Sequence, residues 1–167
     1  MAESGRDVLV FEVAGQRFGL LTADVQELVR AVTIVPVPQA PAIVEGIINF
    51  RGRVIPVLDI RARFRLPPKT LEPTDHFIVA RVEERIVALR VDHGLDLVRV
   101  DDADIEDAQG AVPGADYVSW VAKLPHDLVL IHDLRTFLSH AEATAIDEAI
   151  DGSLTTSAVS VREGSVP

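Results

Sequence analysis

The 167-residue sequence contains no cysteine, and this absence excludes several kinds of chemistry. Without cysteine there is no disulfide, no thiol nucleophile and no cysteine-ligated zinc. The sequence also lacks an apolar run of the roughly 20 residues that span a bilayer. Its first residues lack the apolar stretch of a signal peptide. The simplest interpretation is a soluble protein of the cytoplasm.

Aromatic residues are scarce, at 5% of the chain, whereas hydrophobic residues reach 48%. The core must therefore consist mainly of Val, Ile and Leu, a composition that favours strands over helices. The length suits one domain with a sizeable core, or two small domains fused.

The net charge of −10 argues against nucleic acid or an anionic membrane as the main partner. The charge is unevenly distributed. Residues 51–69 hold six basic side chains and a single acid, whereas residues 92–107 hold seven acids and a single base. Such polarity suits steering toward a protein partner, although solvated loops and strand ends would explain most of the same charges.

The most informative feature that is present is an internal repeat. Its two paired blocks are residues 8–31 with 77–100, without a gap, and residues 47–64 with 121–138. The second block keeps Asp59 over Asp133 and Arg61 over Arg135. A duplicated β unit without an apparent catalytic constellation indicates a binding module rather than an enzyme.

Alternating apolar residues predict two hairpins in each copy. The predicted hairpins are residues 8–21, 47–58, 77–91 and 118–132. Gly52 permits a positive φ at the tight turn of the second hairpin. Pro56, which donates no backbone hydrogen bond, should lie at an edge or a bulge.

About five short strands in each copy predict a mainly β fold of two small barrels related by a pseudo-twofold axis. The predicted boundaries are residues 7–66 and 75–138 for the sub-barrels, within a domain of residues 7–150. Barrel closure would remove the sheet edges that aliphatic strands otherwise expose.

Two helices are expected as well. Thr22 is typical of an N-cap, and Val25, Leu28 and Val29 would share one face of a short helix that follows it. A capping box at residues 139–142 opens a C-terminal helix. The C-terminal helix is predicted over residues 139–151, with Ile146 and Ile150 against a barrel, and residues 1–6 and 153–167 are expected to be flexible.

A search for chemistry yields no catalytic residue, metal site or cofactor. The five histidines share no metal-ligand spacing. The acidic run of residues 101–107 superficially resembles a calcium loop, but Asp107 stands where the turn glycine belongs and Pro113 where the closing glutamate belongs. We interpret this run as a solvated loop.

Several motifs resemble those of one known family. They are LVFEVAGQRFGL from Leu9, TADVQELVR from Thr22, IVPVPQAP from Ile34 and IVEGIINFRGRVIPVLDIR from Ile43. An N-x-R-G turn followed by a V-I-P-V-x-D-L/I-R strand is specific to the CheW family of chemotaxis coupling proteins, which this chain resembles over about residues 7–150. The closing SHAEATAIDEAI also matches that family's terminal helix.

The resemblance implies a domain of two five-stranded, SH3-like β-barrels that acts as a non-catalytic adaptor. Members of this family couple the cytoplasmic tips of methyl-accepting chemoreceptors to the regulatory domain of the histidine kinase CheA, and so associate with membrane-bound arrays through protein partners, without inserting into the membrane. By this resemblance the receptor-facing residues are Val25, Glu27, Asn49, Arg51 and Gly52. The residues that would contact the kinase are not indicated.

Physical chemistry gives these positions specific roles. Arg51 at the hairpin tip can reach a carboxylate in fork geometry, and Glu27 is its natural internal partner. Asn49 can bond to the turn backbone, so that Asn49, Arg51 and Gly52 could also serve only to build the turn. Asp59 and its repeat Asp133 are expected to cap the turn after each long strand.

The second copy departs from the motif. Trp120 stands where the first copy has Gly46, and is either a core residue or an anchor for a partner. Residues 123–125, Lys-Leu-Pro, replace residues 49–51, so the hairpin at residues 118–132 should not duplicate the receptor contact.

Other functions remain open from the sequence. The chain could be an adaptor of a related pilus or gliding-motility pathway. A barrel that binds nucleic acid or oligosaccharide is disfavoured, because such a barrel would show exposed aromatics among basic residues.

Overall fold

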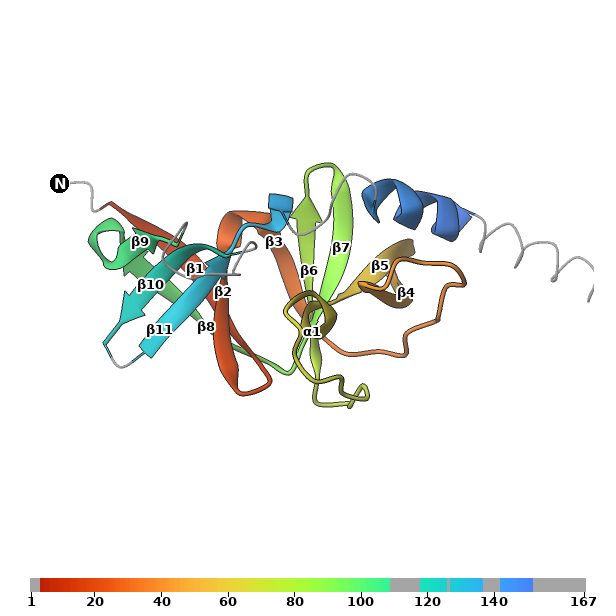
Figure 1. Ribbon diagram of the computed structural model, residues 1–167, viewed down its shortest axis with the longest axis horizontal. Coiled ribbons are helices and arrows are strands. Elements are labelled where there is room, and N and C mark those ends of the chain that lie inside the picture. The colour runs from red at the N-terminus through yellow and green to blue at the C-terminus, as the bar shows by residue number, and fades with distance from the viewer. Residues whose placement is uncertain (1–3, 109–117, 126, 137–141, 152–167) are drawn as a thin grey trace, which may run out of the picture.

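The strands form two sheets that lie side by side in the computed structural model, which describes residues 4–108, 118–125, 127–136 and 142–151 (Figure 1). The first sheet has the order β8 (His93–Asp101), β1 (Gly5–Val13), β2 (Gln16–Leu21), β11 (Asp127–His132), β10 (Val118–Leu124), β9 (Ile105–Asp107). The second sheet has the order β3 (Val25–Arg30), β6 (His76–Val82), β7 (Arg85–Val91), β5 (Arg53–Asp59), β4 (Val44–Phe50). Short helices are η1 (Thr22–Asp24), α1 (Ile60–Arg63), η2 (Asp102–Asp104) and η3 (Leu134–Thr136).

The predicted mainly β class with two SH3-like units is confirmed, with a correction to closure. Within the described residues neither hydrogen-bonded sheet closes into a complete barrel. In the second sheet, the outer strands are instead linked through the segment after β3, where Val35 forms an isolated bridge with Ile47 of β4. Gly46 permits this approach, because a Cβ there would lie 2.2 Å from the Val35 carbonyl oxygen.

The two sheets do not correspond to the predicted sub-barrels at residues 7–66 and 75–138. The β1–β2 hairpin of the first copy pairs with β8 and β11 of the second, while β6–β7 of the second copy pairs with β3 and β5 of the first. Each sheet therefore combines the first hairpin of one copy with strands of the other, four of them in the first sheet and three in the second. The sequence repeat could not reveal this, since either pairing satisfies the same apolar pattern.

Segment 25–30 is a strand, so the helix predicted after Thr22 is wrong. Only η1 forms, its N-cap is Leu21, and that residue makes no side-chain capping bond. From Val25 onward, burial alternates residue by residue, as in a strand with one half-buried face. β3 pairs antiparallel with β6, and sheet pairing therefore overrides a weak local helix signal.

Three apolar clusters form the core. One fills the first sheet around Val10 and Ile131, and another fills the second sheet around Val57 and Phe77. The largest, here called the shared cluster, takes side chains from both sheets and from the helix at residues 142–151. Ile146 of that helix is 1% exposed, and Ile150 packs against the same cluster, as predicted. The capping box cannot be compared, because residues 139–141 lie outside the described residues.

Three smaller expectations need correction. β5 is an interior strand rather than an edge, but it pairs with β7 only from Val57 onward, so Pro56 adjoins a stretch without a ladder on that side. β1 begins at Gly5, inside the segment 1–6 that was predicted to be flexible. The acidic run is largely exposed, as expected, but it forms the end of β8, η2 and β9 rather than a loop.

Candidate functional site

The β4–β5 turn presents an arginine at its tip. Arg51 and Gly52 both have positive φ, 51° and 82°, and the pair Phe50–Arg53 closes this two-residue turn. The Asn49 side-chain oxygen accepts a hydrogen bond from the Gly52 N–H at 2.9 Å, which confirms the expected turn bond. Residues other than glycine seldom adopt a positive φ, because their Cβ then lies close to the backbone. The turn therefore holds Arg51 in an uncommon backbone conformation.

Arg51 and Glu27 form the expected ion pair. The Arg51 Nη2 lies 2.9 Å from Oε1 and 2.7 Å from Oε2 of Glu27, and the guanidinium lies 5.1 Å from the centroid of the Phe50 ring. Glu27 belongs to β3 and Arg51 follows β4, the two outer strands of the second sheet. The pair thus joins the sheet's two edges, while the Arg51 side chain remains 71% exposed and available to a partner.

Val25 has a different setting from the other four predicted residues. It lies on β3, two residues before Glu27, but its side chain is half-buried against the shared cluster. The structure therefore brings Glu27, Asn49, Arg51 and Gly52 together, whereas Val25 lies at the start of β3.

The repeat does not duplicate this ion pair. The position equivalent to Glu27 is Asp96, whose carboxylate accepts a hydrogen bond from the N–H of Leu97 at 2.8 Å. The position equivalent to Arg51 is Pro125, which carries no charge. Of these two equivalent hairpins, only β4–β5 presents an arginine at this position, paired across the edges of its sheet.

The two repeated aspartates have the structural role that the sequence indicates. The Asp59 carboxylate accepts the Arg61 N–H at 2.9 Å and caps α1. Asp133 accepts the Arg135 N–H at 2.9 Å in the same way. Trp120 is partly buried against the core of the first sheet, and the Arg6 guanidinium lies 4.9 Å from its ring centroid, so Trp120 both packs in the core and reaches the surface.

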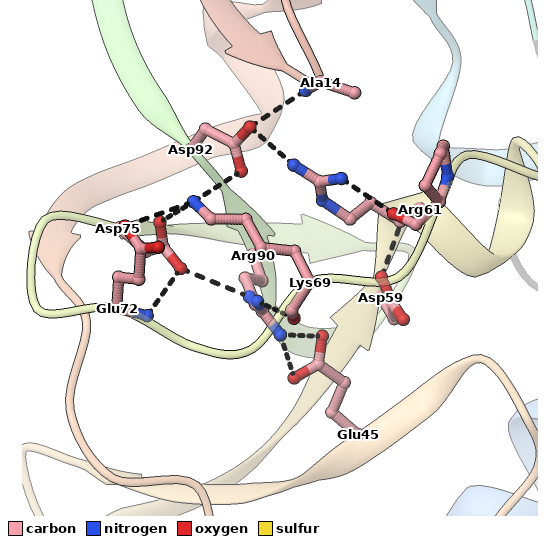
Figure 2. A network of polar contacts seen from close by, with 10 residues as sticks. Ala14, Glu45, Asp59, Arg61, Lys69, Glu72, Asp75, Arg90 and Asp92 are labelled. Carbon is pink, nitrogen blue, oxygen red and sulfur yellow. Dashed lines mark hydrogen bonds and ion pairs between the residues drawn. The ribbon is translucent and has the colours of Figure 1, made fainter.

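A buried network of charges, which sequence reasoning missed, lies where the two sheets meet (Figure 2). Its cations are Arg61, Lys69 and Arg90, and its principal anions are Glu45, Asp75 and Asp92. Asp75 is fully buried and lies 2.9 Å from Lys69 Nζ and 3.6 Å from Arg90 Nε. The available signal was a lone arginine inside the apolar run of β7, since charges are rarely buried without a partner.

Two carboxylates of the network have pKa values shifted in opposite directions. Burial alone would raise the pKa of Asp92, but hydrogen bonds from Arg61 and from the Ala14 N–H, with the nearby positive charges, hold it below its usual value. Burial raises the pKa of Glu45 despite its bonds to Arg90. Each of the three principal carboxylates lies against at least one cation, so the network is a charge-balanced set.

Neither a metal centre nor a membrane span is found in the part of the chain that the structure describes. No group of three or more His, Asp or Glu side chains there could hold a metal ion. No described helix is long and apolar enough to cross a membrane.

Comparison with known proteins decides the family. The family model of the CheW-like domain matches residues 7–142. The chain belongs to the CheW family. CheW-family proteins are non-catalytic scaffold proteins, so the prediction that this chain is an adaptor and not an enzyme is confirmed at the level of the family.

Individual relatives agree with this assignment. The chain is 39% identical to the chemotaxis protein CheW of Rhizobium meliloti over 108 residues, covering 64% of this chain and 68% of the relative. It is 27% identical to CheW of Treponema pallidum over 141 residues, covering 81% and 83%. Among solved structures, the scaffolding protein TtCheW of Thermoanaerobacter tengcongensis superposes with a TM-score of 0.75 at 28% identity, over 81% of this chain and 94% of that one.

Proposed function

We propose that this CheW-family protein couples methyl-accepting chemoreceptors to the regulatory domain of the histidine kinase CheA. The observation that supports this most directly is the exposed Arg51, held on the tip of a strained turn by Glu27 and Phe50. A fixed guanidinium loses less conformational entropy on binding than a free one, and its donors can engage a partner's carboxylate in fork geometry.

In this proposal, the receptor-binding surface consists of Glu27, Asn49, Arg51 and Gly52. Val25 supports this surface by packing β3 against the shared cluster. Its position on the second sheet leaves the first sheet free to contact a different protein. Such a scaffold would work in the cytoplasm and reach membrane-bound receptor arrays through its protein partners, with no cofactor, nucleic acid or metal needed.

The replacement Arg51→Ala should weaken binding to a receptor-tip peptide by about tenfold or more, the range expected for loss of a well-placed interface arginine. Stability should change little, because an exposed ion pair contributes roughly 0.2–1 kcal/mol. Calorimetric titration with the receptor tip and thermal unfolding measure the two effects.

Arg53→Ala on the same hairpin is the matched control, because Arg53 is exposed but outside the proposed surface. Equal losses of affinity in both variants would contradict the assignment of Arg51, as would unfolding of Arg51→Ala at the assay temperature. Failure of the unmodified protein to bind either a receptor tip or a CheA regulatory domain, singly or together, would contradict the proposed function itself.

A further inference from the structure

The chain crosses between the two sheets at equivalent points of the repeat. It passes from β2 to β3 through η1, and from β7 to β8 through Asp92. The equivalent residues at the two crossings are Ala23 and Asp92, the hairpin residues Glu83 and Ala14, and the arginines Arg135 and Arg61. We refer to these places as the Ala23 junction and the Asp92 junction.

The Asp92 junction is held by directional contacts from both sheets. One carboxylate oxygen of Asp92, Oδ2, accepts a hydrogen bond from the Ala14 N–H of the first sheet at 2.9 Å and from Arg61 Nη2 beside the second sheet at 2.7 Å. Its other oxygen, Oδ1, lies 3.6 Å from Lys69 Nζ, and its own N–H donates to the Glu12 carbonyl at 3.0 Å. Figure 2 shows Asp92 between the Ala14 backbone and these two cations.

The cations are themselves fixed on the side of the second sheet. Arg61 also donates to the Pro67 carbonyl at 2.8 Å, and its side chain is 10% exposed. Lys69 donates to the buried Asp75 at 2.9 Å. Asp92 therefore connects the turn of the β1–β2 hairpin to a rigid, charge-balanced part of the second sheet.

The Ala23 junction is built differently, and the charges that act on Arg135 there include Asp24 and Glu83 as well as Asp133. Ala23 carries no carboxylate, and Arg135 turns back to Asp133, the residue that caps its own turn, with Nη2 to Oδ2 at 3.0 Å. The Arg135 side chain is 72% exposed. Of two crossings that the repeat makes equivalent, one is tied by contacts to a buried carboxylate, whereas the other has an alanine at that position and an exposed arginine beside it.

The contrast matters because apolar packing does not fix orientation. The shared cluster holds the sheets together through contacts that are roughly proportional to area and not directional. Hydrogen bonds to a buried carboxylate tolerate little change in distance or angle. Buried ionic groups are weak sources of stability, and their best-attested use is to specify one arrangement among several.

We propose that Asp92 is a positioning residue that sets the orientation of the two sheets, and that this fixed orientation allows two partners to bind at once. The second half of this statement rests on the proposed function. Asp92 does not need to touch either partner, since it acts through Ala14 and Arg61.

The first test measures orientation in the isolated protein. The absence of cysteine allows spin labels at Leu128→Cys on the first sheet and Val54→Cys on the second, which are equivalent positions of the repeat and 60% and 40% exposed. Double electron–electron resonance should give one narrow distance distribution for the doubly labelled parent protein. Adding Asp92→Asn should broaden or shift that distribution, whereas Arg135→Ala, the matched control at the Ala23 junction, should leave it narrow.

The second test measures coupling. Asp92→Asn should bind a receptor tip alone, or a CheA regulatory domain alone, with the affinity of the parent protein. When one of these partners is already bound, the affinity of Asp92→Asn for the other should be about tenfold lower than that of the parent. This is within the usual range of coupling between sites. If Asp92→Asn does not fold, the double variant with Asp92→Asn and Arg61→Gln is tested in its place. The double variant removes both charges of the ion pair, so that Arg61 is not left without its counter-charge.

An unchanged distance distribution in a folded Asp92 variant overturns the proposal, as does equal broadening in Arg135→Ala. Loss of binding to each partner alone would also overturn it, since Asp92 would then act on a binding surface directly. If the unmodified protein binds neither partner, the proposed function fails, but the distance measurement still decides the role of Asp92.

Discussion

Asp75 illustrates how much of this structure depends on single buried charges. Its carboxylate is fully buried, and it accepts hydrogen bonds from Lys69 Nζ at 2.9 Å and from the Glu72 N–H at 3.0 Å. Removing two opposite charges from water costs about as much as their attraction returns, so the pair adds little net stability. Removing the Asp75 charge alone leaves Lys69 and Arg90 with one anion fewer in a buried site, and that is strongly unfavourable.

We therefore expect Asp75→Asn to lower the free energy of unfolding by about 3–5 kcal/mol. The matched control is Asp127→Asn, because Asp127 pairs with Arg17 at the surface, 3.2 Å apart, and such a pair contributes at most about 1 kcal/mol. Urea unfolding at pH 7 measures both. Similar losses in the two variants would show that burial of Asp75 does not determine its contribution.

Asp133 makes stability depend on pH at the acid end. Burial would raise its pKa, but hydrogen bonds from the Arg135 side chain and N–H, together with the guanidinium charge, hold the pKa below its usual value of 3.8. A carboxyl with a lowered folded-state pKa stabilises the fold above its unfolded-state pKa, and this contribution is lost as the pH falls through the folded-state pKa.

Asp133→Asn should therefore be less stable than the parent above about pH 5, and the difference should shrink toward pH 2. Thermal unfolding of both proteins across that range measures the difference. Two curves that stay parallel down to pH 2 would contradict the assignment of this acid dependence to Asp133.

At the scale of elements, equivalent segments of the repeat have become different structures. The two crossings illustrate this, and so do the two chain segments that follow the second hairpins. After α1 the first copy continues into a linker held by Lys69 and Arg61, whereas the second copy ends in the helix at residues 142–151. That helix is attached by Ile146 in the shared cluster and by the ion pairs Arg63–Glu142 and Arg85–Asp147.

Packing rather than charge should dominate the attachment of this helix. Ile146→Ala should destabilise the protein by about 2–5 kcal/mol, the range for truncating a buried isoleucine. Glu148→Ala on the exposed side of the helix should change stability by less than about 0.5 kcal/mol. Chemical denaturation compares them, and a negligible cost for Ile146→Ala would show that the helix is not part of the cooperative fold.

At the scale of the whole molecule, the exchange of hairpins makes the two copies interdependent. The β1–β2 hairpin has its ladder partners β8 and β11 far along the chain, so neither copy by itself can build a complete sheet. Long-range pairing of this kind is realised only when both halves are present, and an isolated two-stranded hairpin is at best marginally stable.

A fragment of residues 1–66 should therefore be unfolded alone, and so should a fragment of residues 67–167. Mixing or co-expressing the fragments should restore the fold. Amide proton dispersion in NMR spectra distinguishes the outcomes. A dispersed, native-like spectrum from either fragment alone would mean that the copies fold independently, against the observed strand order.

The candidate site was predictable to the extent that it is local in sequence. Asn49, Arg51 and Gly52 lie within one turn, and their turn chemistry constrains them whatever surrounds them. The Glu27–Arg51 pair was also anticipated, through the family resemblance and the complementary charges. The strand nature of residues 25–30 was not, because a capping residue followed by spaced apolar residues fits a helix until pairing with β6 is known.

The sequence by itself determined the strand-rich composition and the duplication. It also determined the Arg51–Gly52 turn and the aspartate caps, because each of these depends on neighbours a few residues away. Only the tertiary structure decided which hairpin joins which sheet, and that Arg61, Lys69 and Asp92 meet where the sheets join. The contacts of Asp92 link residues up to 78 positions apart in the sequence, as in the hydrogen bond that it accepts from the Ala14 N–H. A pattern of apolar and polar residues specifies which faces are buried, but not which distant face each will cover.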